Sequence, residues 1–426
     1  MTLKSAGLAE RSIRKTLQTL RSVDNFYSDR VGRISILFVV RNTLGAACLI
    51  PLIKEAEKRK GVKITITDEY DGCIDWPANG ELAELRSLYY LPPSMSIFLK
   101  KWHYVFTTEA CGLTFLRSTT KVFIYHGCGY GNLDRNTDDF KEDDYLKKIV
   151  RNSSLSLYFC NSYIDREVLS GHLESKHDLS VKKLFVSGMP RMDRLVNCDK
   201  SIRQTYLSGL GLNPDNKTVV ISSHWTKKSL HKSFGVMSVE ALSQSYPDVN
   251  ILVFGHGNLW RDDKGSLTRQ FEQLQSSASN VRFLPNLEDT VPLLVSGDIF
   301  VGDNSSIFIE FCLMDKPVVF FDHPDFVFSD PLVEQLYKDA SCHFSNIPQL
   351  VSAVGDCLTK QDVKVSQRKA VVDNFLAKRG RSSAYVMDAV EAIGKLSGPN
   401  SKNWPRIDGL LEHDCSNNSE GESSEL

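Results

Sequence analysis

The sequence predicts an α/β protein in which two doubly wound parallel sheets face each other across a central cleft. Short apolar runs alternate with stretches of helical pattern, the runs are apolar throughout, and the whole pattern starts again after about residue 200. Continuous apolar runs separated by helices are typical of parallel strands that helices cover on both faces. A chain of 426 residues is long enough for two or three domains of about 100–200 residues each.

The first series of strands predicts a Rossmann-like domain over residues 31–198. It begins with Ile34–Val40, after which Asn42 to Gly45 open a helix that runs to about Lys60. The further strands of this half are expected at Val62–Ile66, His103–Phe106, Val122–Tyr125, Ser156–Phe159 and Leu184–Val186. Because short buried strands alternate with helices throughout, we expect the strands to pair in parallel.

The second series predicts another Rossmann-like domain over residues 199–395. Its strands are expected at Thr218–Ile221, Ile251–Phe254, Val281–Phe283, Asp298–Val301 and Pro317–Phe321, and its helices near Ser233–Ser245, near Ser266–Ser276 and from about Ser305. Ligands of such sheets bind beyond the carboxyl ends of the strands. We therefore expect a ligand in the cleft between the two domains.

The two ends of the chain lie outside these series. Residues 1–30 are predicted to form a basic amphipathic helix, because five basic side chains accompany one acidic side chain before residue 22 and apolar side chains line one face. Two interpretations stay open: the helix docks on its own protein, or it adsorbs to an anionic membrane surface. Residues 396–426 are rich in Ser, Asn, Gly and Glu and are predicted to be a disordered tail.

The bulk composition argues against several classes of protein. Lys and Arg total 51 against 52 for Asp and Glu, and a formal net charge of -1 disfavours binding of nucleic acid through its phosphates. The 10 cysteines form no CxxC pair and several lie in apolar runs, which favours a reducing compartment over a disulfide framework or a zinc site. No apolar run approaches the roughly 20 residues that span a bilayer, and the N-terminus lacks the apolar core of a signal peptide. We expect a cytoplasmic protein, with peripheral contact at the inner face of the plasma membrane left open.

A glycine-rich turn follows the strand that ends near Tyr125. It reads His126-Gly127-Cys128-Gly129-Tyr130-Gly131. A neutral imidazole at His126 could take a proton from an attacking hydroxyl, and Gly127 would let the backbone pass close to a ligand. The alternatives are a histidine in a structural turn and a nucleophilic Cys128, whose thiol nothing marks as activated.

A second constellation opens the helix expected after Val301. Ser305 and Ser306 offer hydroxyl and backbone N–H groups at a helix N-terminus, which suits a diphosphate, and Glu310 lies one turn further on, where it could accept hydrogen bonds from a ribose. Asp303, in the same segment, is a further candidate for binding this ligand. In the alternative interpretation, Asp303 or Asn304 only caps the helix and Glu310 is solvated.

Two more motifs follow strands of the second half. Gly255-His256-Gly257 places a histidine between glycines, where it could contact the phosphates of a donor or belong to a structural loop. The run from Ser222 to Lys228 supplies hydroxyl groups. Those of Ser223 and Thr226 are candidates for binding the phosphorylated donor molecule. The lysines of that run could offset phosphate charge or form a solvated basic loop.

The fifth motif is Ser187 to Asp193, near the expected domain junction. Arg191 could clamp a phosphate, or Arg191 and Asp193 could only hold the junction together. Four of the five motifs fall at strand carboxyl ends, and these strands come from both halves of the chain. The motifs are therefore expected to converge on one site.

Taken in order, these segments resemble the CDP-glycerol glycerophosphotransferase family, which makes poly(glycerol phosphate) in teichoic acids and in some bacterial capsules. The resemblance covers roughly residues 100 to 325. The matching segments are His126-Gly127, Gly188–Asp193, Ser223–Thr226, His256, Gly302–Ser306 with Glu310-Phe311, and Lys316–Val319. The family pattern differs after His126, where Gly-Cys-Gly stands here, at Gly257, where a proline is common, and at Ser223-His224-Trp225, where Pro-Thr-Trp or Pro-Thr-Phe is usual.

The resemblance implies a GT-B fold, a CDP-linked polyol donor and roles for two histidines and two serines. His126 is implied as the base, and His256 with Ser305 and Ser306 as the group that holds the donor phosphates. The implied reaction transfers glycerol phosphate from CDP-glycerol to a hydroxyl of a polymer or glycan acceptor and releases CMP. No cofactor is expected to be required, no metal site is predicted, and Mg²⁺ could accompany the diphosphate.

Two other functions stay open at this stage. A GT-B enzyme acting on a UDP-sugar, either a glycosyltransferase or a 2-epimerase, fits the predicted fold and the strand-end histidines equally well. A nucleotide-binding subunit without catalytic activity, acting in a capsule or envelope assembly complex, would fit the departures from the family pattern.

Overall fold

The computed structural model describes most of the chain between Ile34 and Lys395. The described ranges are 34–109, 118–125, 157–174, 183–199, 201–262, 265–285 and 289–395, with a few single residues besides, Gly127 among them. The helix predicted over residues 1–30, the tail predicted over 396–426 and the side chains of His126 and Cys128 lie outside the described residues. Within the described part of the chain, no helix is long and apolar enough to cross a membrane.

The first sheet has six parallel strands in the order β2-β1-β3-β4-β5-β6. The strands are β1 (Ile34–Val40), β2 (Val62–Asp68), β3 (Trp102–Thr107), β4 (Ser118–Ile124), β5 (Leu157–Cys160) and β6 (Lys183–Val186). The helices described between them and directly after them are α2 (Thr43–Glu57), α3 (Glu81–Tyr89), α4 (Met95–Leu99), α6 (Tyr163–Glu174) and α7 (Pro190–Val196). The helix expected after Asn42 is present, and the side chain of Asn42 caps it by accepting a hydrogen bond from Gly45 N–H at 2.7 Å.

The second sheet also has six parallel strands, in the order β12-β11-β10-β7-β8-β9. The strands are β7 (Thr218–Ser223), β8 (Asn250–Gly255), β9 (Val281–Phe283), β10 (Ile299–Gly302), β11 (Val318–Phe321) and β12 (Cys342–Phe344). The helices of this half are α8 (Ile202–Gly209), α9 (Leu230–Phe234), α10 (Met237–Ser245), α11 (Gly257–Asp262), α12 (Ser266–Ser277), α13 (Val291–Ser296), α14 (Ile307–Leu313), α15 (Pro331–Ala340), α16 (Ile347–Thr359) and α17 (Val365–Phe375).

The prediction of two parallel-sheet domains is confirmed, with two local differences. The helix expected over Ser233–Ser245 is divided into α9 and α10, because Gly235 between them adopts a φ of 55°, which a continuous helix does not allow. The strand β12 (Cys342–Phe344) was not predicted, because its central residue, His343, is polar and exposed, so the sequence shows no apolar run there.

The continuous apolar runs of the strands have a simple structural cause. In β1, the side chains of Ile36, Phe38 and Val40 belong to one core cluster, whereas those of Leu37 and Val39 belong to another on the opposite face. The strands of the second sheet alternate in the same way between two further clusters. Each sheet is therefore buried on both faces, which requires apolar residues at consecutive positions.

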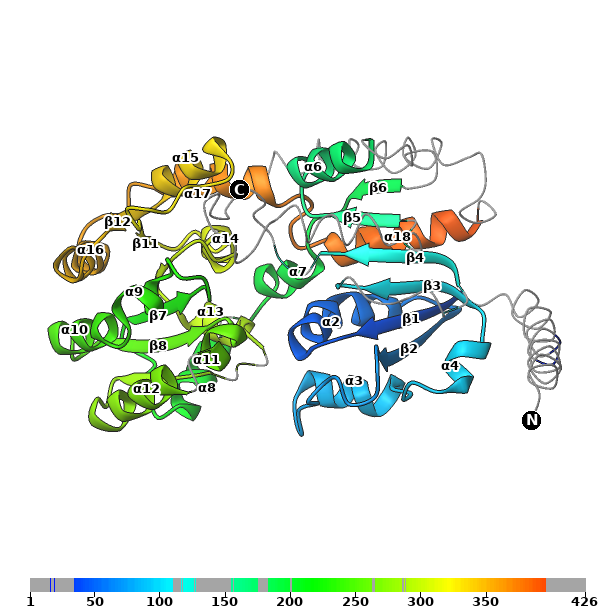
Figure 1. Cartoon of the computed structure of the whole chain (residues 1–426), viewed down its shortest axis with the longest axis horizontal. Coiled ribbons are helices and arrows are strands. Elements are labelled where there is room, and N and C mark those ends of the chain that lie inside the picture. The colour runs from blue at the N-terminus through cyan, green and yellow to red at the C-terminus, as the bar shows by residue number, and fades with distance from the viewer. Residues whose placement is uncertain are drawn as a thin grey trace, which may run out of the picture.

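The last helix of the described chain, α18 (Ser382–Lys395), returns to the first domain. Its buried side chains, which include Val386, Met387 and Val390, pack in the same core cluster as those of β1, and Tyr104 donates a hydrogen bond to the carbonyl of Val390 at 3.0 Å. Figure 1 shows α18 running beside β4 and β5. The helix lies within the range that the sequence assigns to the second domain. The domain boundaries themselves stay predictions.

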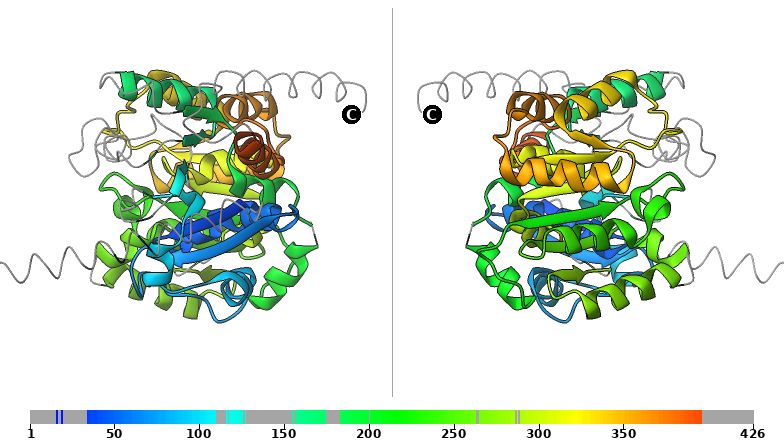
Figure 2. Two further views of the ribbon diagram at one scale, coloured as in Figure 1. Left: turned by 90° about the vertical axis from the view of Figure 1, so that its right-hand side faces the viewer. Right: turned by 90° about the vertical axis from the view of Figure 1, so that its left-hand side faces the viewer.

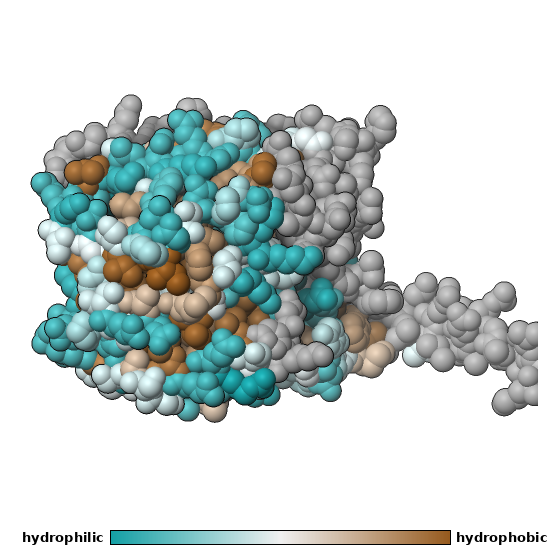
Figure 3. Space-filling view, turned by 60° about the vertical axis from the view of Figure 1, so that its left-hand side comes forward, coloured by the Kyte–Doolittle hydropathy of each residue, from teal (hydrophilic) through white to brown (hydrophobic). Residues whose placement is uncertain are grey.

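The carboxyl ends of the two sheets are turned toward each other. In Figure 1 the arrow of β4 points toward the second domain and that of β8 points toward the first. The helix α7, which follows β6, is joined to α14, which follows β10, by an ion pair of 2.9 Å between Arg191 and Glu310. The view from the second domain in Figure 2 shows α16 at the outer end of the molecule. Figure 3, with the side of the second domain turned forward, shows apolar surface framed by hydrophilic side chains.

Candidate active site

Asp303 ties two neighbouring strand ends together at the carboxyl edge of the second sheet. It follows β10 directly and is 2% exposed. Its carboxylate accepts hydrogen bonds from Ser223 Oγ at 2.8 Å and from the backbone N–H groups of His224 at 2.9 Å and Leu230 at 2.8 Å. Burial raises the pKa of Asp303 to about 6, although these hydrogen bonds lower it. One side chain thus holds the loop over residues 224–230 against the end of β10.

Three aromatic rings gather beside this loop. His224 and Trp225 come from the loop itself, and His256 follows β8. The ring centroid of His256 lies 5.7 Å from that of His224 and 6.1 Å from that of Trp225. Burial, assisted by the nearby His256, lowers the pKa of His224 to about 3, so this imidazole is neutral at pH 7.

His256 is the exposed member of this group. The ring nitrogen Nδ1 of His256 accepts a hydrogen bond from the backbone N–H of Asn258 at 3.1 Å. The backbone N–H of His256 donates to the carbonyl of Ser223 at 3.1 Å. Because a nitrogen that accepts a hydrogen bond carries no proton, the proton of a neutral ring lies on Nε2. An Nε2–H donor at a strand carboxyl end is suited to a phosphate oxygen.

The segment after β10 carries the two serines that the sequence predicts to bind the donor. Ser305 and Ser306 are partly exposed and directly precede α14. The N–H group of Ser305 donates to the carbonyl of Asp303 at 2.7 Å. Gly302 is required just before this turn, because a Cβ there would lie 2.3 Å from the ring of Phe300 and 2.9 Å from the carbonyl oxygen of Ser222. The end of β10 therefore passes close to β7 and brings the serines to the same edge as the three rings.

Arg191 and Glu310 form a buried pair where the two domains meet. Arg191 is 7% exposed and Glu310 is 1% exposed, and their charged groups are 2.9 Å apart. Arg191 also donates to the hydroxyl of Thr290. Burial raises the pKa of Glu310, and Arg191 opposes that shift. Among the described residues, Glu310 Oε1 has no hydrogen-bond partner.

The rest of the segment after β6 also contacts other parts of the fold. The carboxylate of Asp193 accepts hydrogen bonds from the backbone N–H groups of Ser382 at 2.9 Å and Ser383 at 2.7 Å, at the start of α18. Arg194 forms ion pairs with Glu81 and, at 2.8 Å, with Asp289. These contacts agree with the interpretation that Arg191 and Asp193 hold the junction. Direct contact of Arg191 with a phosphate stays a prediction.

Six of the predicted site residues lie together, because β10, β7 and β8 are neighbours in the sheet. They are Ser223, Thr226, His256, Asp303, Ser305 and Ser306. Ser223 and Asp303 are buried and hold the loop, whereas His256 is exposed. Thr226 is 5% exposed, and its hydroxyl lies 3.3 Å from Nδ1 of His224. Contact of any of these residues with the donor stays a prediction.

On the first sheet, the turn after β4 is described only in part. The carbonyl of Gly127 accepts a hydrogen bond from Asn161 Nδ2 at 2.7 Å, and Asn161 follows β5. The backbone at Gly127 is therefore at the carboxyl edge of the first sheet, as the sequence predicts. His126 itself lies outside the described residues, so its role as base stays a prediction.

The sequence interpretation selected the hydroxyls of the motif Ser222 to Lys228 and passed over His224 and Trp225. Both rings contact the ring of His256. The available signal was their position directly after a predicted strand, next to a second strand-end histidine. Which of several polar residues in a short loop turns inward cannot be read from the order of the residues alone.

Two facing parallel-sheet domains, with imidazole and hydroxyl groups at the carboxyl ends of the strands, place the chain in the GT-B fold class. The chain belongs to the CDP-glycerol:poly(glycerophosphate) glycerophosphotransferase family, whose model matches residues 82–392. The resemblance stated from the sequence motifs is thereby confirmed. A search of curated proteins gives no match.

Solved structures support the same fold. The wall teichoic acid polymerase TagF is 14% identical, with a TM-score of 0.62 over 91% of this chain and 96% of that chain. A TagF variant soaked with CDPG has a TM-score of 0.63 at 13% identity, over 91% of this chain and 96% of that chain. S. aureus MnaA with UDP has a TM-score of 0.56 at 14% identity, over 86% and 97%. At these identities the likeness extends to the fold alone.

Proposed function

We propose that this transferase moves glycerol phosphate from CDP-glycerol to a hydroxyl of a polymer or glycan acceptor and releases CMP, in the synthesis of a teichoic acid or capsule polymer. The observation that carries the proposal is the family match over residues 82–392, which includes every residue of the cluster around Asp303 and His256. The likeness to the wall teichoic acid polymerase TagF, which has also been solved after soaking with CDPG, supports the donor and the polymer class.

The chemical step needs one base and a well-held diphosphate. In the proposed step, His126 takes the proton of the acceptor hydroxyl, and that oxygen attacks the phosphorus that carries the glycerol. The new P–O bond forms as the bond to the bridging oxygen breaks, and CMP leaves with the electron pair. Transfers of this kind depend on alignment and charge stabilisation more than on covalent chemistry.

The second sheet would hold the donor. We assign the diphosphate to Nε2–H of His256 and to the hydroxyl groups of Ser305 and Ser306, because these groups share one edge of the sheet and are at least partly exposed. Thr226 lies beside His224 in the loop that Asp303 and Ser223 hold.

The junction would complete the site. Glu310 is proposed to accept from the ribose through Oε1, which has no partner among the described residues, and Arg191 to orient that carboxylate. Gly127 is proposed to bring backbone close to the reacting groups. Any Mg²⁺ would arrive with the diphosphate. Residues 1–30, basic on one side, are proposed to hold the enzyme at the inner face of the membrane, near a membrane-bound acceptor.

The test is incubation of the full chain with CDP-glycerol and candidate glycerol phosphate acceptors, with released CMP as the readout. His126→Ala is expected to lower turnover by about 10²-fold or more while the melting temperature stays unchanged. Undiminished turnover in that variant removes His126 from the role of base.

A thermal-shift comparison separates the other functions. CDP is expected to raise the melting temperature more than UDP does at equal concentration, because a ligand selective for the folded state stabilises it. A preference for UDP would favour a UDP-sugar enzyme. Stabilisation by CDP without release of CMP, across all acceptors, would favour a binding subunit without catalytic activity.

A further inference from the structure

Two cysteines meet at the edge of the second sheet that lies away from the candidate active site. Cys342 is the first residue of β12, and Cys357 lies in the last turn of α16. Both side chains are partly buried against the core cluster of that face, they line the same small cavity, and each thiol shifts the pKa of the other. Because β12 is parallel to its neighbours, its first residue lies at the amino edge of the sheet, opposite the edge that carries Asp303 and His256.

The two thiols open onto a small cavity. It has a volume of about 150 Å³, and its lining includes Cys342, Cys357, Lys364 and Arg368. Arg368 is engaged by Asp315 and Asp362, so Lys364 is the cation that acts on Cys342. A small solute such as a peroxide is of a size to enter this space.

The contact between the thiols makes one of them the nucleophile. The nearby Cys357 thiol and, to a smaller extent, Lys364 lower the pKa of Cys342, although burial and the carboxylates of Asp356 and Asp362 oppose this shift; the same contact raises the pKa of Cys357. Of the two thiols, Cys342 is therefore the one that loses its proton more readily. Thiolates, not thiols, react with peroxides.

We propose that Cys342 and Cys357 form a reversible disulfide site that a hydroperoxide oxidises. The Cys342 sulfur attacks one peroxide oxygen, so that an S–O bond forms, the O–O bond breaks and the other oxygen leaves as water after taking a proton. The Cys357 sulfur then attacks the Cys342 sulfur, the S–S bond forms and the S–O bond breaks, which releases the second water. Two thiols are oxidised and one hydrogen peroxide is reduced to two waters.

The bridge would join the edge strand β12 to the helix that packs beside it. It closes a short loop between residues 342 and 357, which restricts the unfolded chain more than the folded one. We expect oxidation to raise the melting temperature of the full chain by roughly 5 °C or more. Turnover at saturating donor is expected to stay unchanged, because the pair lies at the opposite edge of the sheet from His256.

The sequence offers a direct readout of this reaction. Trypsin cuts after Lys338 and Lys360, and the peptide between them contains these two cysteines and no other. After treatment of the wild-type protein with hydrogen peroxide at about equimolar concentration and then iodoacetamide, the peptide is expected to lack two hydrogens and to carry no alkyl group. After dithiothreitol it is expected to take up two alkyl groups. A second digestion that cuts before Asp356 should give two fragments that stay joined until they are reduced.

Matched variants separate the roles of the two sulfurs. Cys357→Ser should stop the reaction at a sulfenic acid on Cys342, which dimedone traps, and Cys342→Ser should abolish the reaction at this peptide. Cys198→Ser is the control, because Cys198 is also partly buried but burial raises the pKa of its thiol. That variant should form the bridge at the wild-type rate.

The wild-type peptide decides the proposal even if a variant fails to fold. A peptide that still takes up two alkyl groups after peroxide treatment overturns the proposal. It is also overturned if Cys342 reacts with iodoacetamide in the native protein no faster than Cys198 does.

Discussion

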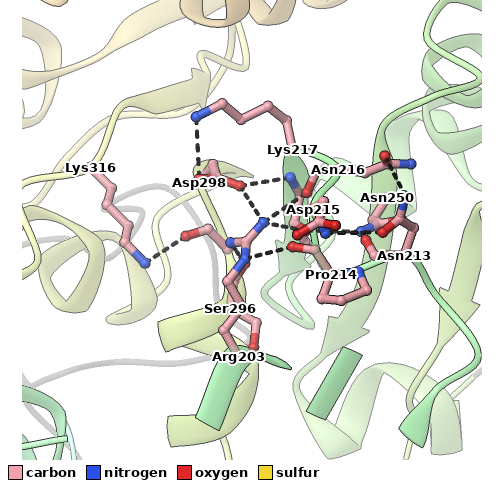
Figure 4. Close-up of polar contacts among 12 residues, drawn as sticks. Arg203, Asn213, Pro214, Asp215, Asn216, Lys217, Asn250, Ser296, Asp298 and Lys316 are labelled. Atoms are coloured by element: carbon pink, nitrogen blue, oxygen red, sulfur yellow. Dashed lines mark hydrogen bonds and ion pairs between the residues drawn. The ribbon is translucent and has the colours of Figure 1, made fainter. Parts of the chain in front are cut away.

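Two aspartates flank β10, and they differ in what surrounds their carboxylates. Asp298 precedes the strand and forms ion pairs with Arg203 at 3.0 Å and Lys217 at 3.6 Å, and it accepts a hydrogen bond from Thr218 N–H at 2.8 Å (Figure 4). Asp303 follows the strand, and its hydrogen bonds come from a hydroxyl and from backbone N–H groups, none of which carries a charge. The same strand therefore has a charge-compensated end and an end with a buried carboxylate held by neutral donors.

The difference separates stability from function within one sheet. At the amino edge, Arg203 also donates to the carbonyls of Pro214 and Asn216, so the guanidinium joins α8 to the start of β7 (Figure 4). Cations and carboxylates close to one another lose less by partial burial than either does alone. At the carboxyl edge, the groups that donate hydrogen bonds to the carboxylate of Asp303 are all uncharged. The buried carboxylate instead fixes the loop that carries His224. A local cost in stability at a site edge is typical of functional residues.

The largest effect is expected from Asp303→Asn. The amide keeps the shape of the side chain but turns an NH₂ group toward N–H donors, so the loop over residues 224–230 loses its anchor. We expect turnover to fall by about 10²-fold, since a misplacement of about 1 Å in a phosphoryl-type site can have that consequence. Steady-state release of CMP measures it.

The control for this change is Asp298→Asn at the other end of β10. It removes a carboxylate of similar position but leaves the loop over residues 224–230 untouched, so turnover at saturating donor is expected to match the wild type. Equal losses of turnover in the two variants would contradict the division between the two edges.

The sequence predicted the positions of these groups along the chain but not the partners of their side chains. The strand ends at Val301 and Ile221 could be recognised because both strands are apolar throughout. That Asp303 turns inward to Ser223 depends on the pairing of β10 with β7, and these two residues are 80 positions apart. In the sequence, an aspartate that caps a helix cannot be distinguished from one that, like Asp303, holds a distant loop.

The junction shows the same limit more strongly. Arg191 and Glu310 are 119 positions apart, and Asp193 and Ser382 are 189 apart, so neither contact follows from a local pattern. The return of α18 to the first domain depends on these long-range contacts and on the first core. The sequence could place the junction segment near the domain break, but it could not decide between a phosphate clamp and a structural pair.

The next effect in size concerns the charge-compensated end. Asp298→Ala leaves Arg203 without its carboxylate and Thr218 N–H without its acceptor. The groups are partly exposed, with side-chain exposures of 24% for Arg203 and 26% for Asp298, so the expected loss is only about 2 kcal/mol of unfolding free energy. Urea unfolding measures it. An unchanged transition midpoint would show that this network does not stabilise the domain.

Two glycines, one at each end of β10, allow the same comparison between the two edges of the sheet. A Cβ at Gly302 would lie 2.3 Å from the ring of Phe300 and also 2.9 Å from the backbone carbonyl oxygen of Ser222, whereas a Cβ at Gly297 would meet only side-chain atoms, those of Val220 at 2.5 Å and Phe311 at 2.8 Å. Each alanine variant is expected to cost about 1–2 kcal/mol of unfolding free energy through overpacking.

Only one of the two glycine variants should also affect function. Gly302→Ala pushes on the backbone at the end of β7, so it is expected to lower turnover, while Gly297→Ala leaves turnover unchanged. Turnover measured at saturating donor, beside the melting temperature of each variant, separates the two. A selective loss in the Gly297 variant would reverse the assignment of the two edges.

The last prediction is a pH dependence that belongs to Asp303. Its pKa in the folded chain is raised to about 6 from the ordinary value of 3.8, so the native state binds this proton more tightly than the unfolded state does. The resulting stabilisation is present below about pH 4 and is lost as the pH rises through about 6. Turnover should change in the opposite direction, because a protonated carboxyl is a poorer acceptor for three donors and the loop loosens below about pH 6.

Urea unfolding of the wild type and of Asp303→Asn between about pH 4 and 7 isolates the contribution of the Asp303 carboxyl to the unfolding free energy, since the other carboxyl groups are common to both. The difference in unfolding free energy between the two proteins should change across this window and stay constant above it. A difference that is constant throughout would mean that the carboxyl of Asp303, at the functional end of β10, has an ordinary pKa.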